Sequence, residues 1–185
     1  MIRPILVSSF VITHLLLCAI LPSSAASPAV IYSGDTHWDE QTATMTFQTS
    51  GSMPRTKEGF FWEVPGSVLR IVIERNVTVT GGFRVMYRDK SNPLHIVGED
   101  RETSVIFGTK AQAWTQTNQI AESDKWKYSA IALTQDAEVF VSSLTSMNPR
   151  GYNISGYANR AVIHVDSCTL VDTRPGDNNN SDGFA

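Results

Sequence analysis

The chain has 185 residues and a formal net charge of -3, with 15 Lys and Arg against 18 Asp and Glu. Its positive charges form no basic stripe of the kind that binds a phosphate backbone, so nucleic acid is not an expected partner. The length is sufficient for a single domain with a substantial core.

The first 26 residues have the layout of a secretory signal peptide. Arg3 precedes an apolar run over residues 5–21, and small residues follow, so cleavage is expected after Ala26, with Ala25 as the second choice. Polar residues dilute the run, whereas a membrane span requires about 20 predominantly apolar residues. We therefore expect a secreted protein that is free of the membrane once residues 1–26 are removed.

Removal of this leader also removes Cys18 and leaves Cys168 as the single cysteine. No disulfide can then form within the mature chain, which must depend on its core for stability. Cys168 lies in a β-rich run and is expected to be a small buried apolar residue.

Residues 27–67 contain alternating apolar and polar residues in ATMTFQT and FFWEV, on either side of the turn-like SGSMPRTKEG. Alternation of this kind is typical of strands. Because an open stack of strands needs a covered end, we predict that this segment is an N-terminal cap or the remnant of an N-terminal β-layer.

Residues 68–185 are predicted to be all-β, because short β-branched runs alternate with turn residues and occur in pairs. Four corresponding points in successive pairs, Ile71, His95, Ile131 and Ile163, are 24 to 36 residues apart. A β-sandwich would space its strands more evenly. The variable spacing favours a right-handed single-stranded parallel β-helix, in which neighbouring coils share one apolar core. Since no second cover precedes Ala185, we expect a stack that is incomplete at its C-terminus.

Asparagines recur where corners of such a stack would fall, and in adjacent coils they would bond to one another; they are Asn76, Asn92, Asn148, Asn153 and Asn159. The polar stretch 109–128 is predicted to be a lengthened turn. Its Trp126 is a candidate sugar-binding residue, with ordinary packing as the alternative. His164 alternates with Ile163 and Val165, so it should face outward, either in a substrate groove or as a surface histidine.

The closing stretch DNNNSDGFA contains Asn180-Ser181-Asp182-Gly183-Phe184. This segment resembles the Asn-Thr-Asp-Gly segment of the polygalacturonase family of glycoside hydrolases, and the same coil is similar to the dextranase and isopullulanase family. Upstream, IVIERNVTVTGGF and LHIVGEDRETSVIFG are similar in style to early coils of these families.

The resemblance implies a right-handed parallel β-helix that hydrolyses internal bonds of a pectin- or α-glucan-type polysaccharide with inversion and without an organic cofactor. It assigns only to Asp182 a role, that of the first catalytic aspartate; Asn180 beside it is a candidate substrate-binding residue. Inverting carboxylates lie roughly 6.5–9.5 Å apart, which aspartates on neighbouring coils can satisfy. The partner aspartates would lie beyond Ala185, so this chain by itself is expected to be the inactive N-terminal part of the enzyme.

The alternatives to a hydrolase are a solvated Asn-rich turn that ends one coil, a calcium loop, a polysaccharide lyase and a non-catalytic surface protein. Asn178, Asn180 and Asp182 before Gly183 suggest a calcium loop, but Asn178 stands where Asp is usual and the final Glu is missing, so no metal is expected. A polysaccharide lyase of the same fold would need calcium-binding acids and a basic proton acceptor. A non-catalytic carbohydrate-binding surface protein would need neither.

Three sequons would permit N-glycosylation in a eukaryotic secretory pathway. They begin at Asn76, Asn153 and Asn179. A glycan at Asn179 would crowd the predicted site at Asp182.

Overall fold

The computed structural model describes residues 27–56, 59–108, 129–149, 151–156 and 160–171. In these ranges the protein is all-β, and all but two of the strand pairs are parallel. This part of the chain contains no helix with the length and hydropathy needed to cross a membrane.

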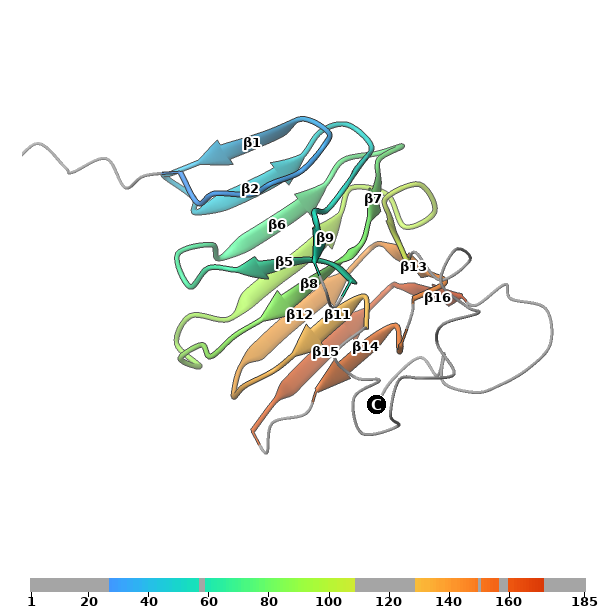
Figure 1. The fold of residues 1–185 in the computed structure, drawn as a ribbon. Helices are drawn as coiled ribbons and strands as arrows, with labels where there is room; N and C mark the ends of the chain where they lie inside the picture. The colour runs from blue at the N-terminus through green and yellow to red at the C-terminus, as the bar shows by residue number, and fades with distance from the viewer. Residues whose placement is uncertain (1–26, 57–58, 109–128, 150, 157–159, 172–185) are drawn as a thin grey trace, which may run out of the picture.

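The strands form three sheets (Figure 1). The first sheet contains, in spatial order, β1 (Thr36–Asp39), β2 (Thr44–Phe47), β6 (Arg70–Ile73), β9 (Leu94–Gly98), β12 (Glu138–Ser142) and β15 (Val162–Asp166). The second contains β16 (Thr169–Val171), β13 (Thr145–Met147), β10 (Val105–Phe107), β7 (Thr78–Thr80) and β3 (Gly51–Ser52). The third contains β14 (Ile154–Gly156), β11 (Ile131–Leu133), β8 (Gly82–Val85), β5 (Gly59–Val64) and β4 (Arg55–Thr56).

From β6 onward, the chain visits the first, second and third sheets in turn and then returns to the first. Thus β6, β7 and β8 make one circuit, β9, β10 and β11 the next, and β12, β13 and β14 the one after it. Each strand pairs in parallel with the corresponding strand of the next circuit, so the circuits stack along one axis, as Figure 1 shows.

The core lies between the three sheets and is built by side chains that alternate inward along each strand. On the first sheet, Ile71 pairs with Ile96, Ile96 with Val141, and Val141 with Val165. The first three are at most 1% exposed, whereas Val165, on the last described strand of this sheet, is half-buried. Near β1 and β2 the core is aromatic, because Phe47 packs edge-to-face against Trp62 and Phe83.

The predicted repeat points are wrong in register. Ile71 pairs with Ile96 rather than with His95, which faces outward, and Ile131 lies on β11 in the third sheet rather than in the first. The sequence shows the runs in pairs, whereas a circuit contains three strands. A pair that crosses from the third sheet to the first therefore looks the same as one that crosses from the first to the second.

Three of the corners that join the first sheet to the second contain a left-handed residue. Asn76, Ser143 and Ser167 occupy the same place, two residues before β7, β13 and β16, and have φ values of 63°, 55° and 53°. Asparagine tolerates this left-handed conformation better than most residues. The predicted ladder of asparagines is wrong, because Asn92 and Asn148 lie at the other two kinds of corner.

Cys168 follows this corner and is half-buried rather than fully buried. It corresponds to Leu144 of the preceding circuit, which is 0% exposed, and it packs against the core. Burial raises the pKa of its thiol. Cys168 therefore acts as a small core residue in the last described circuit.

Residues 27–67 supply β1 to β5. The strand β1 pairs antiparallel with β2, while β2, β3 and β5 pair in parallel with β6, β7 and β8. Tyr32 adds to the aromatic part of the core near β1 and β2. The centroid of its ring lies 4.9 Å from that of Phe47, and its hydroxyl donates to the carbonyl oxygen of Thr49.

Ser146 points into the core between Ile106 and Leu170, and its Oγ has no hydrogen-bond partner among the described residues. A buried hydroxyl without a partner is destabilising, so Ser146→Ala should raise the free energy of unfolding by about 1 kcal/mol. Urea denaturation measures this change, with Ser142→Ala on the outer face as a control that should be nearly neutral. Destabilisation by Ser146→Ala would show that the hydroxyl makes a stabilising bond.

Burial raises the pKa of Tyr32 to about 12 from an ordinary value of 10.0. The neutral phenol is thus favoured in the folded state, and the stability it contributes is complete below pH 10.0 and is lost as the pH rises toward 12. Tyr32→Phe should make the fall in unfolding free energy over this window shallower. Denaturation at several pH values, with the exposed Tyr87→Phe as control, tests this; equal slopes for all three proteins would contradict it.

Candidate functional site

Of the residues that the sequence predicts for the site, only His164 is described. Asp182, Asn180 and Trp126 lie outside the described residues, as does the stretch 109–128. His164 lies on β15 and faces outward, as its alternation with Ile163 and Val165 predicts.

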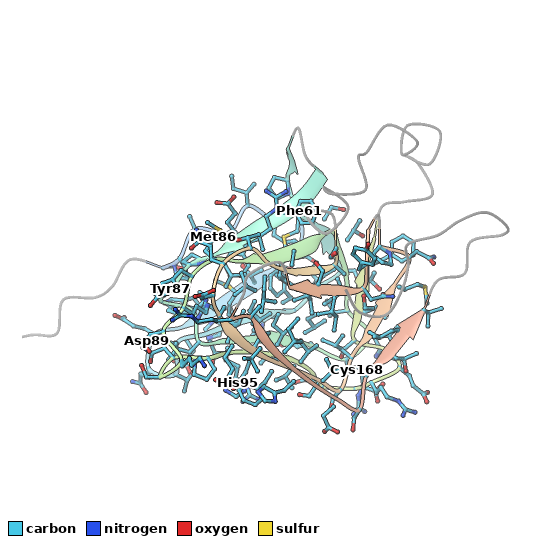
Figure 2. All side chains as sticks on the ribbon, turned by 90° about the horizontal axis from the view of Figure 1, so that it is seen from below. Phe61, Met86, Tyr87, Asp89, His95 and Cys168 are labelled. Atoms are coloured by element: carbon cyan, nitrogen blue, oxygen red, sulfur yellow. The ribbon has the colours of Figure 1, made fainter. Side chains whose placement is uncertain are left out.

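His164 belongs to a row of three rings on the outer face of the first sheet. His95 pairs with Phe140, and Phe140 pairs with His164 across adjacent parallel strands. The ring centroids of His95 and Phe140 are 4.9 Å apart with an interplanar angle of 9°, and those of Phe140 and His164 are 4.2 Å apart with an angle of 6°. Figure 2 shows His95 on the outside of the molecule. We call His95, Phe140 and His164 the ring row.

The ring row runs along the stacking axis, because its three residues lie opposite one another on three neighbouring strands. The rings lie face to face, so their edges point toward solvent. Two imidazole edges, which donate and accept hydrogen bonds, therefore flank one apolar phenyl edge. Along the row, hydrogen-bonding contacts thus alternate with an apolar contact.

Glu138 orients the ring of His164. Its Oε1 lies 2.8 Å from Nε2 of His164, and the two side chains are 23% and 48% exposed. An ionised carboxylate accepts only, so Nε2 carries the proton and Nδ1 is the acceptor whenever the imidazole is neutral. The pair thus fixes which ring nitrogen can donate and which can accept.

A shallow pocket adjoins the strand starts of the first sheet. It has a volume of about 140 Å³ and lies where the chain returns from the third sheet to the first; its lining residues are Tyr87, Arg88, Asp89, Lys90, Asp136, Ala137 and Arg160. We call it the corner pocket. Tyr87 is 63% exposed at its rim, and Figure 2 shows Met86, Tyr87 and Asp89 along one side of the molecule.

Arg88 holds the wall of the corner pocket in place. It is 5% exposed, and its Nη1 and Nη2 donate to the carbonyl oxygens of Val68 and Pro65 at 2.6 and 2.7 Å. Its backbone N–H donates to the carbonyl oxygen of Asp136 at 3.0 Å, which ties the two corner loops together. Burial lowers the pKa of the Arg88 guanidinium. Arg88 is therefore a structural cation.

The remaining charges around the pocket are partly neutralised. Asp136 forms an ion pair with Arg160, with Oδ2 and Nε 3.7 Å apart. The Asp89 carboxylate accepts a hydrogen bond from the backbone N–H of Ser91, which lowers the pKa of Asp89. The pocket thus offers mixed polar contacts beside the exposed Tyr87 ring.

Within the described part of the chain, no group of three or more His, Cys, Asp or Glu side chains could hold a metal ion. No known protein family matches the chain, and neither the curated proteins nor the solved structures contain a significant match. Function must therefore be inferred from the residues and the fold.

Sequence reasoning missed Phe140, Glu138 and the corner pocket. Alternation along residues 138–142 already places Glu138 and Phe140 on one face. The residues that Glu138 and Phe140 contact could not be predicted, because the sequence does not specify the register between β12 and its neighbouring strands. Tyr87 and Arg88 lie in a stretch without alternating apolar and polar residues, so the sequence does not indicate the corner pocket.

Loss of Arg88 should destabilise the fold. Arg88→Ala removes two charge-assisted bonds, to the carbonyl oxygens of Val68 and Pro65, and among the described residues only the Pro65 oxygen keeps another donor, the N–H of Val68, so we expect a loss of about 3 kcal/mol in unfolding free energy. Arg88→Lys should recover only part of this, because one ammonium lacks the planar fork. Thermal or urea unfolding measures the effect, with Lys90→Ala as a control at the exposed rim. A change below about 1 kcal/mol for Arg88→Ala would contradict the anchoring role.

Proposed function

We propose that the protein is a secreted, polysaccharide-active right-handed parallel β-helix, and that together with further coils it hydrolyses internal glycosidic bonds with inversion. The fold assignment is supported by the repeated passage through three parallel sheets and by the shared apolar core. Each circuit adds one strand to each sheet, so the outer face extends as circuits are added.

The ring row is the observation that carries the functional part of the proposal. A polysaccharide is long and repetitive, and the row follows the long axis of the stack over β9, β12 and β15. A sugar chain lying along this face meets imidazole, phenyl and imidazole edges in succession. Glu138 keeps the His164 edge in one orientation, which reduces the entropy lost on binding.

In this proposal Asp182 takes part in the reaction, and the ring row binds the substrate. An inverting hydrolase needs one carboxylic acid to protonate the leaving oxygen and one carboxylate to activate water. Asp182 supplies one carboxylate of such a group, and the resemblance to polygalacturonases and dextranases is its support. No organic cofactor takes part.

A non-catalytic carbohydrate-binding protein is the second candidate. The ring row and the corner pocket favour it, since both offer contacts to sugars without requiring a reacting group. The two candidates share the binding face and differ only in the chemistry assigned to Asp182.

Binding tests the face that both candidates share. His164→Ala should weaken binding to the preferred polysaccharide about tenfold, as loss of one well-placed hydrogen bond of about 1.4 kcal/mol would do. Affinity electrophoresis or calorimetry with polygalacturonate and with dextran measures it. Ser142→Ala, on the same outer face, is the matched control. Unchanged affinity in His164→Ala would remove the ring row from the binding site.

Activity then separates the two candidates. In the chain extended by its following coils, Asp182→Asn should abolish the release of reducing ends and leave polysaccharide binding intact. Turnover that survives this substitution would refute the catalytic role of Asp182. Binding without any release of reducing ends by the unsubstituted protein would establish the non-catalytic candidate.

A further inference from the structure

We infer that Asn76 is an N-glycosylation site and that Asn153, although it lies in a sequon of the same type, is not one. The inference rests on the secretion that the proposed function includes. It concerns the two sequons in the described part of the chain, Asn76-Val77-Thr78 and Asn153-Ile154-Ser155.

Asn76 is exposed at a corner between the first and second sheets. Its φ of 63° carries the chain around the corner, and its backbone N–H donates to Oγ1 of Thr103 at 3.3 Å. The corner conformation is thus held through backbone atoms. A glycan on Nδ2 would extend into solvent without breaking this bond.

The rest of the first sequon is compatible with a glycan. Val77 is 3% exposed and packs in the core, while Thr78 begins β7 with its side chain on the outer face. The Thr78 backbone N–H donates to Oγ of Ser50 at 2.8 Å. Modification of Asn76 therefore leaves β7 and the inward Val77 undisturbed.

Asn153 has the opposite environment. It is 1% exposed, and both Ile154 and Ser155, which complete its sequon, are 0% exposed. Its backbone carbonyl oxygen accepts a hydrogen bond from the N–H of Ile131 at 3.1 Å. A sugar on Nδ2 of Asn153 needs a volume that the packed third sheet does not leave, so β14 could not pair with β11.

The reaction requires a lipid-linked oligosaccharide and the transferase of the secretory pathway. The Nδ2 nitrogen of Asn76 forms a bond to C1 of the first sugar, and the bond from C1 to the polyprenyl diphosphate oxygen breaks. The amide loses one proton, and the diphosphate leaves as an anion. No oxidation or reduction takes place.

A glycan at Asn76 is compatible with access to the corner pocket. Asn76 follows the end of β6, whereas the corner pocket lies before the starts of β9, β12 and β15. Asn76 therefore lies beside the C-terminal ends of the strands of the first sheet, and the corner pocket lies beside their N-terminal ends. The glycan would leave the corner pocket open.

The test is secretion from a eukaryotic host with a heterologous leader, in an Asn179→Gln background that removes the third sequon. Intact mass before and after enzymatic removal of N-glycans should reveal one glycan, and peptide mapping in H₂¹⁸O should place it at Asn76. Asn76→Gln and Thr78→Ala should lack the glycan, Thr78→Ser should retain it, and Asn153→Gln should not change the glycan mass.

An unmodified Asn76 in the secreted, folded protein would overturn the inference, and so would a glycan on Asn153 in that fraction. Polysaccharide binding by the Asn76→Gln protein is measured in parallel and should be unchanged. Because the leader is heterologous, a missing glycan speaks against Asn76 alone, whereas missing polysaccharide binding speaks against the proposed function alone.

Discussion

Parallel backbone pairing between successive circuits is the constraint on which the rest of this molecule depends. Once Ile71 pairs with Ile96, alternation of side chains decides which residues enter the core and which face solvent. A shift of one residue would turn Ile96 outward and bring His95 inward. The same register that buries the aliphatic columns therefore also aligns the ring row on the opposite face, without any separate interaction to assemble it.

The corners differ because the core restricts them differently. Between the first and second sheets, Ser143 and Ser167 complete the turn with one left-handed residue, and Leu144 and Cys168 return at once to the interior. Between the third and first sheets the loops are longer, and lengthening a surface loop costs little once the strands on either side are paired. The corner pocket forms there, and the buried Arg88 holds its wall by hydrogen bonds to the carbonyl oxygens of Val68 and Pro65.

Much of the fold could be predicted from local signals. The β-branched runs, the absence of a helical period and the recurrent turn residues indicate an all-β chain of stacked short strands, and the described residues form parallel sheets. The register could not be predicted, because two runs and a short link look alike at every corner. Ile131 was for this reason matched to the wrong sheet, and the strands β8, β13 and β14 were missed.

For the site, the sequence by itself determined that His164 faces outward, since alternation within one strand is a local property. It also marked Asp182 and Asn180 through a short resemblance. Only the tertiary structure decided that Phe140 stacks on His164, that Glu138 bonds to it, and that the Asn153 sequon is buried. These facts depend on hydrogen-bond register between strands more than twenty residues apart, which no local pattern of residues specifies.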